Sequence, residues 1–212
     1  MHPRETGRRY DAVAAQVDAD LRASSYGVSF LERAIARCAT RGAALDVGCG
    51  AGGRMIERLL GAGFRVTGLD VSRAMLDIAH ARHPSVEFVH DDVAEWSPPR
   101  AYDLVLAWDS IFHLPYAAHT LVLGKLCGCL AEGGVLLFTA GGIDGEMVGA
   151  MHGREFAYSS LSEIALLRLL RDCGCVPLLM ERDQYPLHHV VIIALKAAMP
   201  PAQRAHPPGD RP

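Results

Sequence analysis

Residues 45–54 form an apolar run that meets closely spaced glycines and then enters a helical pattern. This order predicts a strand, a tight turn and a helix start, because glycine permits unusual backbone angles and lets a ligand approach the main chain. Gly48, Gly50 and Gly53 fit the dinucleotide fingerprint G-x-G-x-x-G, and Asp70 follows about 20 residues later, where that fingerprint has an acid for a ribose hydroxyl. The glycines predict a nucleotide-containing ligand but do not decide which one.

Further polar residues follow other short apolar runs. Asp46, Asp92 and the pair Asp109 and His113 each stand at or just beyond the end of such a run. In open α/β sheets, ligands bind at the carboxyl ends of the strands. Carboxylates there can accept hydrogen bonds from ribose hydroxyls and amino groups, and Asp109 or His113 can orient or deprotonate a second substrate.

The elements that position these residues alternate along the chain, which is typical of a parallel sheet with crossover helices. Only Gln184 to His189 separates the last two predicted strands, so we expect an antiparallel return near the sheet edge. The predicted strands are 43–47, 65–69, 86–90, 103–108, 134–140, 176–183 and 190–196. The predicted helices are 8–22, 27–39, 54–60, 73–82, 117–130 and 161–172, with Ser72 and Ser160 as N-caps.

The 212 residues predict one domain over 1–198, followed by a disordered tail at 199–212. The net charge of -3 and the near absence of lysine argue against nucleic acid binding. No signal peptide or apolar run of about 18 residues is present, so we expect a cytoplasmic protein with no membrane partner. The six cysteines are then reduced thiols, and their C-G-C spacings do not favour a metal site.

Four segments have the same pattern: each contains an apolar run that ends in glycines, in acidic residues or at a tryptophan. They are Leu45 to Gly52, Val66 to Ser72, Val86 to Val93 and Tyr102 to Trp108. Together they resemble the class I S-adenosylmethionine-dependent methyltransferases, with a resemblance that runs from about residue 26 to residue 196. The resemblance implies an α/β, Rossmann-like three-layer sandwich with a seven-stranded, mostly parallel sheet and one antiparallel strand near the edge. It also divides the domain into a helical cover (1–40), a cofactor half (43–140) and a substrate half (141–198).

The resemblance implies S-adenosylmethionine as the cofactor and gives the strand-end residues separate roles. Asp70 would hold both ribose hydroxyls, and Asp92 would accept from the adenine amine. The ammonium group would meet Asp46 and carbonyls near Gly48 and Ala107, while Arg54 suits the ligand carboxylate. The remaining candidates for cofactor contact are Gly50, Gly52, Val71, Met75, Val93, Trp108 and, on an N-terminal helix that closes over the cofactor, Tyr10.

The methyl acceptor must be bound by segments beyond the cofactor strands. We expect Asp109, His113 and Tyr158 to be the catalytic candidates, with Tyr158 on a glycine-rich, substrate-facing loop at 141–158. At most one of the neighbouring residues 188 and 189, both histidines, is expected to reach the site if they lie in the last strand.

Methylation of an oxygen or nitrogen of a small molecule, by a monomer or homodimer, is the function we favour. The alternatives are a protein or peptide methyltransferase, a non-catalytic cofactor-binding scaffold and an NAD-dependent oxidoreductase. The oxidoreductase interpretation accounts for the glycines and Asp70, but it gives no role to Asp46 and Asp92.

Overall fold

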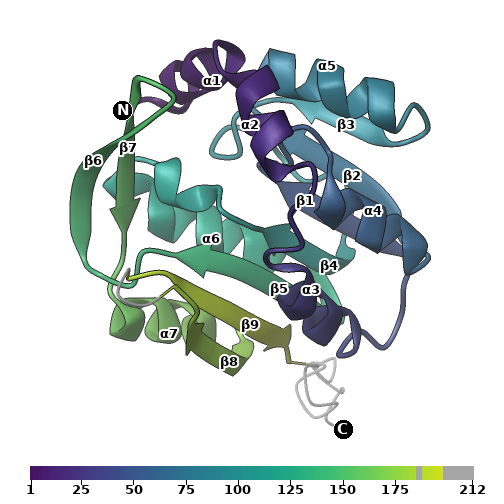
Figure 1. Ribbon diagram of the computed structural model, residues 1–212. Helices are drawn as coiled ribbons and strands as arrows, with labels where there is room; N and C mark the ends of the chain where they lie inside the picture. Colours follow the sequence, from purple (N-terminus) through teal and green to yellow (C-terminus); the bar gives the residue numbers. More distant parts are fainter. Residues whose placement is uncertain (185–187, 198–212) are drawn as a thin grey trace, which may run out of the picture.

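The computed structural model describes residues 1–184 and 188–197, so the predicted tail lies outside the described part. Seven strands form one sheet in the order β3-β2-β1-β4-β5-β9-β8. Strand β9 is antiparallel to both β5 and β8, and the other pairs of this seven-stranded sheet are parallel. The Rossmann-like sheet with one reversed strand near its edge is therefore confirmed (Figure 1). The strands are β1 (Ala43–Val47), β2 (Arg65–Asp70), β3 (Glu87–His90), β4 (Tyr102–Ala107), β5 (Leu130–Ala140), β8 (Cys175–Arg182) and β9 (Val190–Lys196).

The sheet separates two hydrophobic cores, because successive side chains of a strand point to opposite faces. Leu45 and Val105 pack into one core, whereas their neighbours Ala44 and Leu104 pack into the other. Helices cover both faces, and every residue of β1 is buried. This double burial explains why the central strands read as continuous apolar runs rather than as alternating patterns.

Helices connect most of the strands and cover both faces of the sheet. The α-helices are α1 (Pro3–Asp11), α2 (Ala14–Leu21), α3 (Val28–Ile35), α4 (Arg54–Gly61), α5 (Arg73–Arg82), α6 (His119–Gly128) and α7 (Glu163–Asp172). Two short 3₁₀ helices, η1 (Ile111–His113) and η2 (Tyr116–Ala118), follow β4. Within the described residues, none of the helices has the length and apolar character needed to cross a membrane.

The structure confirms one of the two predicted N-caps and contradicts the other. Ser72 caps α5 as predicted, since its side chain accepts a hydrogen bond from the Met75 amide. The prediction of Ser160 as the cap of α7 is wrong, because Ser162 accepts the capping bond and Ser160 is buried.

The single predicted helix at 8–22 is two helices in the structure. The first begins at Pro3, a residue that suits the first turn of a helix because it has no amide hydrogen to leave unpaired.

The prediction of a loop over 141–158 is wrong, because most of this segment is a two-stranded antiparallel hairpin. Strands β6 (Gly145–Met151) and β7 (Arg154–Ser160) are joined at His152 and Gly153, which both have positive φ values of 49° and 71°. Positive φ at both central residues is the hallmark of a type I′ hairpin turn. The hairpin extends from the main sheet to α1, as Figure 1 shows.

Candidate active site

A cavity of about 990 Å³ lies at the carboxyl ends of the central strands. Helices α1 and α2 and the hairpin contribute to its wall, so it is bounded by segments far apart in the sequence. The predicted site residues that line it are Tyr10, Asp46, Gly48, Gly50, Arg54, Asp70, Val71, Met75, Asp92, Val93, Trp108, Asp109, His113 and Tyr158. Gly52 and Ala107 are absent from the lining: Ala107 is fully buried inside the sheet, and its successor Trp108 reaches the cavity instead.

The glycine turn after β1 has the geometry that its sequence predicts. Gly48, Gly50 and Gly52 all have positive φ, at 70°, 54° and 62°. A Cβ atom on Gly48 would lie 2.2 Å from the Cβ of Ser110, so the close approach of these segments also requires glycine there. Gly52 faces helix α5 instead of the cavity, because a Cβ on it would lie 2.9 Å from the Cβ of Ala79.

Three carboxylates surround this turn at the ends of neighbouring strands. Asp70 accepts hydrogen bonds from the amides of Gly50 and Ser72, both at 2.8 Å, and burial raises its pKa. Asp92 is 5% exposed, and its Oδ1 accepts from the Ala94 amide at 2.9 Å. These bonds fix the orientation of two carboxylates that still border the cavity.

Asp46 differs from the other two carboxylates because it is buried beside another acid. Burial, reinforced by the nearby charge of Asp70 and opposed by that of Arg54, raises the pKa of Asp46 to about 7. Arg54 itself donates from Nε to the Tyr26 carbonyl at 2.6 Å, which anchors its guanidinium at the cavity wall. Asp46 is therefore a group whose charge responds strongly to a cation in the cavity.

The N-terminal helix α1 is joined to the predicted catalytic segment through His113. Nδ1 of His113 lies 3.0 Å from the Ala157 carbonyl, and Nε2 lies 2.8 Å from the Tyr10 hydroxyl. A carbonyl only accepts, so Nδ1 carries the hydrogen and Nε2 accepts from Tyr10. Burial lowers the pKa of His113, which favours this neutral form. The two hydrogen bonds of His113 thus connect the hairpin, through Ala157, to the helical cover, through Tyr10.

The acceptor side of the cavity has aromatic walls. Tyr158 packs against His113 and Phe112, with ring centroids 4.7 and 5.6 Å apart. The Trp108 ring stacks on Phe30 at 5.9 Å, and its indole Nε1 is buried without a hydrogen-bond partner among the described residues. These rings give the cavity an apolar wall near Asp109.

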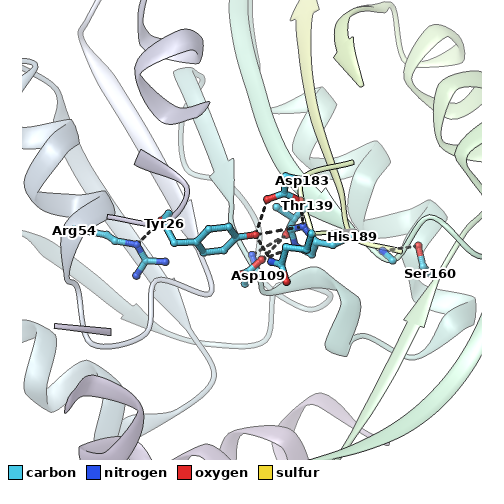
Figure 2. Close-up of polar contacts among 9 residues, drawn as sticks. Tyr26, Arg54, Asp109, Thr139, Ser160, Asp183 and His189 are labelled. Atoms are coloured by element: carbon cyan, nitrogen blue, oxygen red, sulfur yellow. Dashed lines mark hydrogen bonds and ion pairs between the residues drawn. The ribbon is translucent and has the colours of Figure 1, made fainter. Parts of the chain in front are cut away.

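A cluster centred on His189 is the part of the site that the sequence did not predict as catalytic (Figure 2). Its Nε2 lies 2.9 Å from Oδ1 of Asp109, and its Nδ1 lies 2.5 Å from Oδ1 of Asp183. His189 lines the cavity while His188 is exposed, so one of the two histidines reaches the site, as expected. Asp183 was missed altogether. A signal for both residues was available in the short return between β8 and β9, because Asp183 lies at its start and His189 at its end.

The central part of the chain, which builds the cofactor side of the cavity, matches a known family model. The seven-stranded sheet carries a glycine turn after β1 and acids at the ends of β1 and β2, and these residues border one cavity. Residues 44–134 match the family model described as a methyltransferase domain. This part of the chain is therefore similar to a methyltransferase domain.

Curated relatives match over less than half of the chain. A trans-aconitate 2-methyltransferase of Methylobacterium radiotolerans is 45% identical over 96 residues, which are 44% of this chain and 35% of that protein. The enzyme of the same name from an Acidovorax species is 41% identical over 95 residues, 43% of this chain and 35% of its own. The matched segment thus spans about a third of these relatives.

Solved structures match over nearly the whole chain at lower identity. The complex of DhpI with S-adenosylhomocysteine has a TM-score of 0.67 and 24% identity, and covers 92% of this chain and 97% of that one. The 1,6-didemethyltoxoflavin-N1-methyltransferase of Burkholderia thailandensis has a TM-score of 0.61 and 24% identity, with 91% of each chain covered. At this level of identity the likeness is one of fold.

Proposed function

We propose that this protein transfers a methyl group from S-adenosylmethionine to an oxygen or nitrogen of a small molecule. The observation that carries the proposal is the set of Asp46, Asp70 and Asp92 around one cavity at the glycine turn. In this proposal Asp70 accepts from the ribose hydroxyls, Asp92 accepts from the adenine amine, and Asp46 pairs with the ammonium group. Arg54 and the start of α4 are suited to the carboxylate of the ligand.

The charge of the cavity favours this cofactor over a dinucleotide. A pyrophosphate beside the glycine turn would face the carboxylates of Asp46 and Asp70, and the Gly50 amide already donates to Asp70. Like charges at such short range are repulsive, especially in a partly buried site. A sulfonium cofactor is a cation, so the same carboxylates attract it.

The sulfonium supplies an electrophilic methyl group, and the protein has to position the acceptor and exclude water. Trp108, Phe112 and Tyr158 form the apolar walls of the acceptor side. Asp109 is the residue that we assign to the acceptor proton, because it lines the cavity and its side chain is 35% exposed. His113 is assigned a positioning role, since both of its ring nitrogens are bonded within the protein.

The enclosure of the cavity supports a small-molecule acceptor, because residues of the hairpin and of the helical cover form part of its wall. We retain a cytoplasmic location, a monomeric or homodimeric state and the lack of a nucleic acid partner as parts of the proposal. A protein methyltransferase would need the hairpin to open for a peptide, and a scaffold would bind the cofactor without turnover.

Calorimetry with S-adenosylhomocysteine and with NAD tests the cofactor, and radiolabelled S-adenosylmethionine with a metabolite library tests transfer. We expect Asp70→Asn to weaken S-adenosylhomocysteine binding about 10- to 100-fold, since hydrogen bonds to charged groups contribute about 1.5–3 kcal/mol each. Asp77→Asn is the matched control, because Asp77 pairs with Arg73 on the exposed face of α5. Binding of NAD without binding of S-adenosylhomocysteine would refute the proposal, and binding without transfer to any acceptor would favour the scaffold.

A further inference from the structure

His189 lies between two carboxylates that follow different strands of the sheet, the central strand β4 and the edge strand β8. Asp109 follows β4 and contacts Nε2 at 2.9 Å, whereas Asp183 follows β8 and contacts Nδ1 at 2.5 Å. An ionised carboxylate only accepts hydrogen bonds, so both ring nitrogens must donate. With both carboxylates ionised, this geometry gives an imidazolium, and the three groups together carry one net negative charge.

The half of this cluster farther from the cavity is held by further bonds. The Tyr26 hydroxyl donates to Oδ2 of Asp183 at 2.7 Å, and the Gln184 amide donates to the Tyr26 oxygen. Asp183 has a side chain that is only 7% exposed, so its charge is shielded from water. Both oxygens of Asp183 are thereby occupied, which leaves His189 little freedom to rotate.

Aromatic rings surround the imidazole of His189. The centroids of Tyr26 and Trp108 both lie 6.3 Å from it, and that of Phe112 lies 6.5 Å away. Arg54 on α4, which donates to the Tyr26 carbonyl, is a further charged group of the cavity wall. Between these groups, burial lowers the pKa of His189 and its two carboxylates raise it, with a net rise.

Asp109 is the cavity end of the cluster and has an unusual backbone. Its φ is 50°, in the left-handed region that a residue other than glycine rarely adopts. The Asp109 amide donates to Oγ1 of Thr139 at 2.8 Å, and that hydroxyl donates to Oδ1 of Asp109 at 3.2 Å. Oδ1 therefore accepts from both Thr139 and His189. Within residues 1–184 and 188–197, Oδ2 of Asp109 has no hydrogen-bond partner.

We propose that Asp183 and His189 are positioning residues that clamp Oδ1 of Asp109 and present its Oδ2 to the methyl acceptor. The inference rests on the proposed function and deepens it, because an oxygen that only accepts selects an acceptor that donates. The acceptor group is accordingly an amine or a hydroxyl, and a carboxylate such as that of trans-aconitate is repelled.

The proton balance of the reaction follows from this arrangement. As the acceptor atom forms its bond to the methyl carbon, the carbon–sulfur bond breaks and its electron pair returns to the sulfur. The hydrogen of the acceptor passes to Oδ2 of Asp109, and its former bonding pair stays on the acceptor atom. Protonated Asp109 then returns its proton to water, while His189 remains an imidazolium throughout.

The state of His189 can be measured without knowing the acceptor. We would titrate the ring nitrogens of ¹⁵N-histidine-labelled protein by NMR, in the wild type and in Asp183→Asn and His188→Gln variants. We expect both nitrogens of His189 to be protonated at pH 7 in the wild type. We expect its pKa to fall by about one unit or more in Asp183→Asn, which removes a neighbouring charge, and to stay unchanged in His188→Gln. A neutral His189 in the wild type at pH 7 would overturn the clamp.

The acceptor class is tested with radiolabelled S-adenosylmethionine and a panel of aromatic amines, phenols, alcohols and trans-aconitate. We expect product with an amine or hydroxyl compound and none with trans-aconitate. For the active compound, His189→Gln and Asp183→Asn should lower kcat about 10- to 100-fold and shift its pH profile, because small displacements of a reacting group cost up to about 100-fold.

The binding constant of S-adenosylhomocysteine should change less than twofold in these two variants, and His188→Gln should match the wild type. Transfer to trans-aconitate in preference to the amines and hydroxyl compounds, or no transfer to any of the latter, would overturn the assigned acceptor class. If the wild type does not bind S-adenosylhomocysteine, the proposed function itself is refuted. A wrong acceptor class and a wrong cofactor therefore give different results.

Discussion

The buried acid of β1 gives the cofactor site a predicted pH dependence. Asp46 is 3% exposed and has a pKa of about 7, raised chiefly by burial. If it pairs with the cofactor ammonium, only its ionised form binds well. With that pKa, about a tenth of the molecules carry ionised Asp46 at pH 6 and about nine-tenths at pH 8. We therefore expect the association constant for S-adenosylhomocysteine to rise about tenfold over this range, or about 1.4 kcal/mol.

Isothermal titration calorimetry in buffers of different ionisation enthalpy measures both the affinity and the protons released. Near pH 7 we expect a release of about half a proton per S-adenosylhomocysteine bound, since about half of Asp46 must ionise on binding. The Asp46→Asn variant should bind more weakly at pH 8 and show neither the release nor the steep pH dependence. An affinity that is flat between pH 6 and pH 8 in the wild type would refute the assigned role of Asp46.

The raised pKa of Asp46 also affects the stability of the free protein, which we expect to fall with rising pH while the affinity for S-adenosylhomocysteine rises. A carboxyl whose pKa rises from about 3.8 in the unfolded chain to about 7 in the folded protein binds its proton more tightly when folded, so stability falls as the pH rises from about 4 to 7. At pH 8 the free Asp46→Asn variant should therefore be more stable than the wild type, by up to about 4 kcal/mol for three pKa units. Thermal denaturation with and without S-adenosylhomocysteine measures both effects.

Two further predictions concern the glycine turn and the helical cover. Gly48→Ala should destabilise the protein by about 1–3 kcal/mol more than Gly63→Ala in chemical denaturation, because both glycines have positive φ but only Gly48 faces another Cβ, that of Ser110, at 2.2 Å. Equal losses in the two variants would contradict the close approach. Deleting residues 1–24 should weaken S-adenosylhomocysteine binding, because this segment supplies Tyr10 and other parts of the cavity wall; unchanged affinity and turnover would argue against a cover.

The strands of the main sheet and the cofactor side of the cavity were predictable because their signals are local. Buried parallel strands are continuous apolar runs, and their carboxyl ends meet at one edge, so Asp46, Asp70 and Asp92 had to lie near one another once the strands were recognised. The reversed strand followed from the short return between β8 and β9, which has no room for a crossover helix.

The hairpin was missed although its turn carries a local signal. Most β6 side chains are exposed, so the segment lacks the alternating apolar pattern of a half-buried strand. Its many glycines then suggested a loop. Gly153 after His152 was the remaining evidence for a tight turn, and its meaning depends on the two strands that flank it.

The sequence by itself determined the fold class, the glycine turn and the acids that border it, because short-range periodicity and strand ends encode them. The tertiary structure decided the acceptor side, where side chains from distant segments meet. Asp109 and His189 are 80 positions apart, and Tyr10 and His113 are 103 apart. No local pattern specifies such pairs, since they depend on how the return after β8, the hairpin and α1 pack against the end of β4.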